Sequence, residues 1–276
     1  MKKIINPKSI PFIVVACSII GMVLRIWTQG GGPDVFGLYP EMPLAWGVLG
    51  LFSVALVAAL IVALRPLQVS GSYSENYPKS IFGFAGYVLA GGAVLFSAYE
   101  QFKGPMAVMT DLVTVFFGVA AGVVMLVLSV YRLQGTKPPF MLHGFICLYL
   151  ALRMFNRCQI WSNETQTGEL LIPFLASVTL MLAFYQRTCF DVDMGKRPKC
   201  LLLMLLGTYL CMVAVLSFED IVFYAAWALW LMTNLCSLQP LQKKAHVEGV
   251  APGEDMEEPQ DRMAQQPESE PADEKQ

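Results

Sequence analysis

Long apolar runs constrain this chain more than any other feature of its sequence. Each run is about 20 residues long and is bounded by charged residues, proline or glycine, which is enough for a helix to cross a hydrocarbon core of roughly 30 Å. Only 14% of the residues are charged, against roughly 25% in a soluble globular domain. The sequence therefore predicts an all-α, polytopic integral membrane protein in contact with the lipid bilayer, and excludes an ordinary water-soluble enzyme.

Eight of the runs qualify as transmembrane helices. They cover about 10–28, 43–64, 81–100, 111–131, 139–158, 170–187, 200–218 and 220–239. Only Glu219 and Asp220 separate the last two, but together these runs are too long for one crossing, so we expect a tight hairpin there. The transmembrane domain is thus expected to occupy residues 1–239.

The positions of lysine and arginine orient these helices, because basic loops resist translocation. If the N-terminus is inside, four basic residues lie at outer ends: Arg25, Lys103, Arg153 and Arg157. Thirteen lie in inner segments: Lys2, Lys3, Lys8, Arg65, Lys79, Arg132, Lys137, Arg187, Lys196, Arg197, Lys199, Lys243 and Lys244. This asymmetry predicts eight helices with both termini in the cytoplasm.

Landmarks of the first four predicted helices recur in the last four. Leu24-Arg25-Ile26-Trp27 corresponds to Leu152-Arg153-Met154-Phe155, and Glu41 corresponds to Glu169 at the same offset. Such a pattern is expected of a parallel repeat of four plus four helices, although apolar helices also match by chance. A homo-oligomer is neither required nor excluded.

The composition changes from Pro240 onward. Ten acidic residues accompany four basic ones, and aromatic residues are absent, so residues 240–276 are expected to form a disordered, acidic cytoplasmic tail. Its negative charge argues against nucleic acid as a ligand. The tail is either a solvated spacer or a docking segment for a basic partner.

Motifs for metals, cofactors and catalysis are missing from the sequence. The seven cysteines form no C-x-x-C, and no H-E-x-x-H, G-x-S-x-G or P-loop pattern occurs. His143 has no second histidine or carboxylate at metal-ligand spacing and is expected to be a satisfied polar residue. We therefore expect no metal, no cofactor and no enzyme activity.

Two sets of residues are candidates for binding a solute. Arg153 and Arg157 share one helix face near the outer boundary, either as a structural salt-bridge cluster or as an anion site. Trp227 and Asn234 belong to an aromatic face that would line a ligand cavity or serve as ordinary packing. No acidic residue falls near the middle of a predicted span, which disfavours ion-coupled antiport.

The loop between the sixth and seventh spans is a candidate docking site. Asp191 and Asp193 are not needed for topology, so they are candidates for contacting a soluble cytoplasmic protein. This stretch, with Phe190, Met194 and Gly195, and the later Thr233-Asn234-Leu235-Cys236 resemble uncharacterised multi-helix membrane proteins of Gram-positive bacteria. The resemblance implies a bacterial cytoplasmic membrane and no activity.

Two functions fit these observations. The first is a membrane protein that binds or transports a small solute, with the outer arginines and the aromatic face as contacts. The second is a non-transporting membrane subunit or regulator that holds a soluble partner through the Asp191–Asp193 loop and the tail. Substitution of Arg153 or of Asp193 separates the two hypotheses.

Overall fold

The structure is a computed structural model that describes residues 10–28, 43–65, 72–104, 109–161, 167–217 and 220–238. Every regular element within these ranges is helical, which confirms the predicted all-α class. The elements in chain order are α1 (Ile10–Thr28), α2 (Pro43–Leu64), α3 (Tyr73–Asn76), α4 (Ile81–Lys103), α5 (Met109–Gln134), α6 (Phe140–Trp161), α7 (Thr167–Asp191), α8 (Arg197–Ala214), the 3₁₀ turn η1 (Val215–Ser217) and α9 (Ile221–Cys236).

The eight expected ranges agree with eight long helices to within about one helical turn. Six of them are long and apolar enough to cross a bilayer, namely α1, α2, α4, α5, α7 and α8. The chain is therefore a multi-span helical membrane protein. The helix α9 is apolar but has only 16 residues, and α6 carries several polar side chains, so a total of eight spans stays a prediction.

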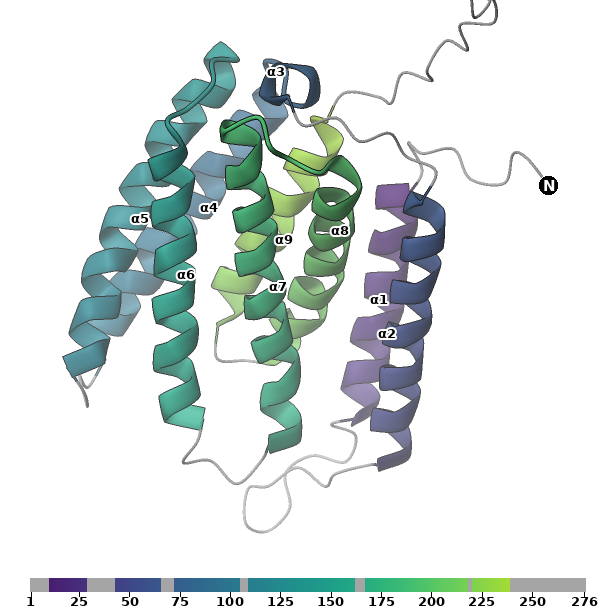
Figure 1. Ribbon diagram of the computed structural model, residues 1–276. Coiled ribbons are helices and arrows are strands. Elements are labelled where there is room, and N and C mark those ends of the chain that lie inside the picture. Colours follow the sequence, from purple (N-terminus) through teal and green to yellow (C-terminus); the bar gives the residue numbers. More distant parts are fainter. Residues whose placement is uncertain are drawn as a thin grey trace, which may run out of the picture. The chain divides into compact units, whose positions relative to one another are not determined.

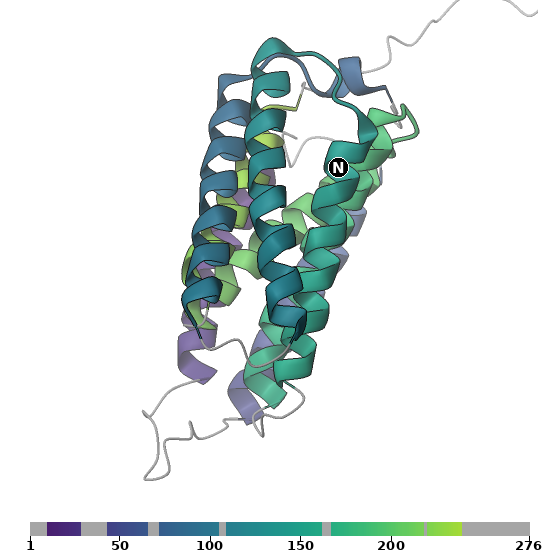
Figure 2. The ribbon, with the colours of Figure 1, turned by 90° about the vertical axis from the view of Figure 1, so that its left-hand side faces the viewer.

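Six helices form a closed ring around the interior of the described bundle. Each of α4 to α8 packs against the next helix in the chain, and α9 closes the ring by packing against α4. The hairpin of α1 and α2 packs on the outside of this ring, against α8 (Figures 1 and 2). The ring interior is therefore the place where distant parts of the sequence meet.

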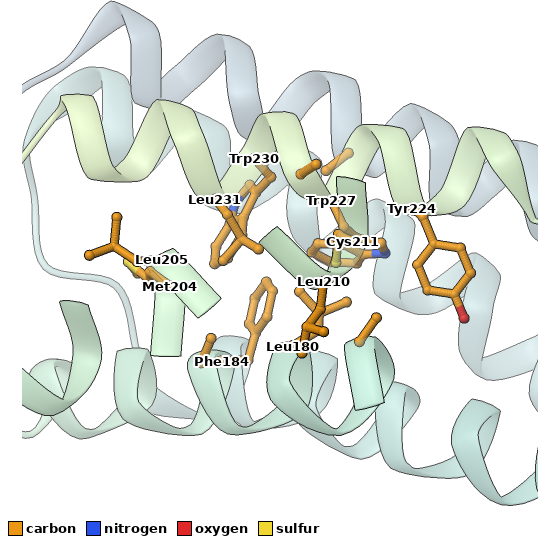
Figure 3. Packing of buried hydrophobic residues seen from close by; sticks show 14 of the residues in the cluster. Leu180, Phe184, Met204, Leu205, Leu210, Cys211, Tyr224, Trp227, Trp230 and Leu231 are labelled. Carbon is orange, nitrogen blue, oxygen red and sulfur yellow. The ribbon is translucent and has the colours of Figure 1, made fainter. Parts of the chain in front are cut away.

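Large aromatic and aliphatic side chains fill the ring interior. Trp230 of α9 stacks on Phe184 of α7 with 4.1 Å between ring centroids, and Trp227 contacts both rings (Figure 3). All three side chains are almost completely buried. By contrast, large apolar side chains on the outer helix faces are exposed, as expected of surfaces that contact lipid.

Small residues allow α4 to lie close to its neighbours. A Cβ atom built on Gly86 would overlap the hydroxyl of Thr233 on α9, and one on Gly83 would clash with Arg132 on α5. The glycines of α4 thus allow close helix packing inside the chain.

The four-plus-four repeat stays a prediction. The two helix pairs that such a repeat would equate differ in their contacts, because α7 packs along α8 whereas α2 makes no comparable contact with α4 among the described residues. The orientation in the membrane also stays a prediction. The acidic tail expected over 240–276 lies outside the described residues.

Candidate functional site

One end of the ring gathers a group of buried polar and charged side chains. There α4, α6 and α8 begin and α5, α7 and α9 end, with α3 beside them. The contact of Arg132 on α5 with Ser237 after α9 and that of Tyr77 with Cys200 on α8 join these helix termini. We call this end of the ring the lysine-rich end, because its described lysines are Lys79, Lys137, Lys196 and Lys199.

Four side chains from three helices form a connected polar chain at this end. The Oη atom of Tyr87 lies 2.8 Å from Nε2 of His143, and Nδ1 of His143 lies 2.6 Å from Oδ2 of Asp191. The other carboxylate oxygen of Asp191 lies 3.5 Å from a guanidinium nitrogen of Arg187. We call these four residues the histidine chain. The side chains of His143, Asp191 and Arg187 are at most 1% exposed, so the chain is shielded from solvent.

Helix geometry explains how the histidine chain assembles. The sequence predicted that the sixth span ends near residue 187, but α7 continues for one more turn to Asp191. Arg187 and Asp191 are four residues apart and therefore share one face of α7. His143 lies in the first turn of α6, which packs antiparallel to α7, so the two helix ends bring His143 and Asp191 together.

Two buried arginines each contact the same tyrosine ring beside the histidine chain. The Cζ atom of Arg187 lies 3.6 Å from the ring centroid of Tyr77, and that of Arg132 lies 5.0 Å from it. We call Arg132 and Arg187 the arginine pair. Tyr77 lies between α3 and α4, and burial raises its pKa well above the ordinary value, so its ring stays un-ionised.

The arginine pair has fewer acceptors than donors. Arg132 donates to the carbonyl of Pro78 at 2.7 Å and to the hydroxyl of Ser237 at 2.6 Å. The Nε–H groups of both Arg132 and Arg187 are buried without a hydrogen-bond partner in the described part of the chain. A buried guanidinium with an unused donor is suited to bind an additional acceptor.

The predicted arginine site lies at the opposite end of the ring. Arg153 and Arg157 do share one face of α6, and both contact the carboxylate of Asp220, at 2.8 and 2.7 Å. The Cζ atom of Arg153 also lies 3.9 Å from the ring centroid of Phe223. We call Arg153, Arg157 and Asp220 the Asp220 cluster. Both interpretations, a structural cluster and a solute site, stay predictions.

The other two predicted solute contacts are buried in the packed interior. Trp227 is 1% exposed and lies between Phe184 and Phe223, while Asn234 is 0% exposed and donates to the carbonyl of Trp230. Trp227 and Arg153 both contact the ring of Phe223, whereas Asn234 belongs to the lysine-rich end of α9. The structure therefore does not bring the four predicted contacts into one site.

The two predicted docking residues lie in different surroundings. Asp191 is buried in the histidine chain, so its carboxylate is not presented to a partner in this conformation. Asp193 is half exposed, pairs with Lys137 and accepts a hydrogen bond from the backbone N–H of Tyr73. The docking prediction therefore remains for Asp193, whereas Asp191 belongs to the interior.

The histidine chain was not predicted from the sequence. His143 was expected to be a satisfied polar residue, and its partners are Tyr87, 56 positions earlier, and Asp191, 48 positions later. The available signal was a carboxylate that topology did not require, placed near the end of a span. In the described ranges, no group of three His, Cys, Asp or Glu side chains is arranged to hold a metal ion.

Comparisons with known proteins give no family for this chain. The sequence matches no protein-family model, and neither a curated protein nor a solved structure shows significant similarity to it. The structural evidence therefore establishes a multi-span helical membrane protein, and any specific function has to be inferred from its buried polar residues.

Proposed function

We propose that this protein binds a small solute at the lysine-rich end of its helical ring, as the first step in carrying it across a bacterial cytoplasmic membrane. The observation that carries the proposal is the burial of the histidine chain and the arginine pair at one end of the helical ring. Ionisable groups inside a membrane protein are costly to bury and commonly mark a solute or proton pathway.

The positions of the charged groups support a solute site rather than a purely structural cluster. Among the described residues, Asp191 at 3.5 Å is the one acidic partner of Arg187, and no acidic side chain lies within ion-pairing distance of Arg132. A structural ion pair stabilises most when its donors and acceptors are all matched. Here buried donors exceed buried acceptors, as expected of a site that a ligand completes.

Binding without catalysis is part of the proposal. Both ring nitrogens of His143 contact protein partners, Tyr87 and Asp191, so neither contacts a bound solute directly, as a general base would. If the lysine-rich end faces the cytoplasm, as the basic residues predict, the site is reached from that side.

A thermal-stability screen of the purified protein in mild detergent tests this proposal. Organic acids, inorganic oxyanions, amino acids, sugars and polyamines are added separately to the wild type, to His143→Gln and to Asp191→Asn. We expect at least one class to raise Tm of the wild type, since a ligand at a hundred times its Kd adds about 2.7 kcal/mol to the folded state.

The matched control is Lys199→Gln, which removes an exposed positive charge at the same end. We expect this variant to respond like the wild type, and the two histidine-chain variants to lose the response. The proposal is wrong if no class stabilises the wild type, or if His143→Gln and Asp191→Asn respond as the wild type does. Uptake of the identified solute into proteoliposomes then tests transport.

A second function is favoured by the surface around Asp193. Val192 and Met194 flank Asp193 and are 45% and 76% exposed, and Lys137 and the backbone of Tyr73 hold the turn in place. We infer from this that a soluble partner could bind there, with this chain as a membrane subunit. Co-purification from the native host, compared between wild type, Asp193→Ala and a deletion of 240–276, tests this alternative.

A further inference from the structure

The buried charges at the lysine-rich end do not balance. The arginine pair contributes two positive charges, and Asp191 is the one acidic side chain that the described residues place in contact with either arginine. The Cζ atoms of Arg187 and Arg132 lie 3.6 and 5.0 Å from the ring centroid of Tyr77, so both positive charges lie beside the same ring. Two cations buried near one another in a medium of low dielectric constant favour binding of an anion beside them.

The unused donors define the shape of that anion. Each arginine has a buried Nε–H without an acceptor in the described chain. The planar fork of guanidinium donors matches two oxygen atoms of a carboxylate, sulfate or phosphate, and it matches a spherical halide less well. The site therefore suits a small oxyanion.

Asp191 connects the arginine pair to His143. Its Oδ2 atom is held by His143 at 2.6 Å, whereas its Oδ1 atom reaches Arg187 only at 3.5 Å. An oxyanion that binds Arg187 competes with this longer contact. The Asp191 carboxylate then loses part of its attraction to Arg187. A protonated His143 would restore a positive charge beside that carboxylate.

We propose that the arginine pair binds a small oxyanion and that each anion enters together with one proton, which His143 accepts. This inference rests on the proposed function and names its substrate class and its coupling ion. The proton comes from the aqueous phase and binds the lone pair of Nε2, while the hydroxyl of Tyr87 rotates and accepts a hydrogen bond from the new N–H. With a monovalent oxyanion the bound pair adds no net charge to the interior, and with a divalent one it adds a single negative charge beside the two arginines.

Among the described residues, Asp191 is the one carboxylate in contact with His143. The titratable or charged groups on the elements around His143 are Tyr87 of α4, Arg132 of α5, Asp191 and Arg187 of α7, Tyr73 and Tyr77 beside α3, and Cys200 and Arg197 of α8. From α9, the neutral ring of Trp230 packs against Tyr87, with 5.4 Å between the ring centroids. Burial and the two arginines disfavour protonation of His143, and the Asp191 carboxylate favours it, so an anion bound at the arginines makes protonation easier.

Linkage fixes the direction of the pH dependence. If an anion promotes protonation of His143, a proton promotes binding of the anion by the same factor. Affinity for the oxyanion is then expected to rise as pH falls, by up to about tenfold per pH unit for one coupled proton. The dependence levels off where His143 is protonated even without the anion.

Isothermal titration calorimetry of the full-length protein in mild detergent tests the proposal. The probes are sodium sulfate, phosphate, acetate and succinate, with sodium chloride as the halide comparison. Each titration is repeated in two buffers with different ionisation enthalpies, which reports the number of protons taken up with each anion. We expect uptake of about one proton per bound oxyanion in the wild type near neutral pH.

Three variants separate the parts of the site. Arg132→Gln is expected to weaken oxyanion binding at least about tenfold, because it removes a buried charge-assisted contact. His143→Gln retains a hydrogen-bonding side chain and is expected to bind the probe without proton uptake and without pH dependence. Lys199→Gln is the matched control and is expected to behave like the wild type. Arg132→Lys keeps a charge beside Tyr77 and replaces Arg132→Gln if the latter does not fold.

The outcomes distinguish this inference from the proposed function. Oxyanion binding in the wild type without proton uptake, or with uptake that persists in His143→Gln, overturns the proton coupling and leaves solute binding intact. Binding of chloride in preference to every oxyanion overturns the ligand class. Absence of binding by all probes, together with a negative thermal-stability screen, overturns the site itself.

Discussion

The lysine-rich end of the ring and the opposite end, which holds the Asp220 cluster and is called the Asp220 end below, contain similar residues in different surroundings. At the Asp220 end, two arginines share one carboxylate, and the side chains of Arg157 and Asp220 remain 26% and 14% exposed. At the lysine-rich end, the side chains of Asp191 and Arg187 are at most 1% exposed. Since water screens the first cluster and not the second, the same type of ion pair is expected to have unequal effects on stability and function.

The largest effect is expected when Asp191 is replaced by alanine. This change leaves Arg187 without its acidic partner and His143 without an acceptor for Nδ1–H, both in the interior. Loss of one partner from a buried pair costs about 3–5 kcal/mol. Reversible unfolding in mixed micelles measures the change, with Asp193→Ala as the control because that carboxylate is exposed. Equal destabilisation by both variants would show that burial does not distinguish them.

At the Asp220 end the two arginines are expected to differ from one another. Arg153 is buried and lies over Phe223, whereas Arg157 is partly exposed. Arg153→Gln is therefore expected to lower the free energy of unfolding by about 1–3 kcal/mol, and Arg157→Gln by less than about 1 kcal/mol. The same unfolding assay measures both. A larger loss for Arg157→Gln contradicts the assigned burial of the two side chains.

The sequence was sufficient to predict where the long helices lie and insufficient to predict the side-chain contacts between them. The limits of α1 and α2 agree with the expected ranges because apolar runs bounded by charge and proline determine where a lipid-exposed helix begins and ends. Proximity of Arg153 and Arg157 followed in the same way from a spacing of four residues on one helix.

Contacts between helices depend on quantities that one sequence does not contain. The pairing of His143 with Asp191 requires that α6 and α7 are neighbours, that each has a particular rotation about its axis, and that α7 continues past residue 187. The short helix α3, which places Tyr73 and Tyr77 against Arg187, carries too few residues to give an apolar period. These long-range contacts are the ones that form the candidate site.

Within the histidine chain, the hydroxyl of Tyr87 is expected to have a smaller effect than the carboxylate of Asp191. Tyr87→Phe removes one neutral hydrogen bond to Nε2 of His143 and keeps the ring that packs against Trp230. The free energy of unfolding is expected to fall by about 0.5–1.5 kcal/mol. Tyr185→Phe is the matched control, because Tyr185 is 55% exposed on α7. A Tyr87→Phe variant as stable as this control indicates that Tyr87 does not bond His143.

The smallest effect is expected at the exposed edge of the lysine-rich end, and it depends on pH. The hydrogen bond from Lys137, with that from the backbone of Tyr73, holds the pKa of Asp193 below its ordinary value of 3.8. A carboxyl whose pKa is lowered by folding stabilises the folded state at pH values above the ordinary pKa, and this contribution disappears as pH falls through the lowered pKa. Asp193→Asn is therefore expected to lower Tm slightly at pH 6 and to have no effect at strongly acidic pH.

Salt should reduce the difference in Tm at pH 6, because the pair of Asp193 and Lys137 is exposed, whereas the effect of Asp191→Ala should be insensitive to salt. A difference that grows as pH falls would show that Asp193 is not held by Lys137 in its ionised form.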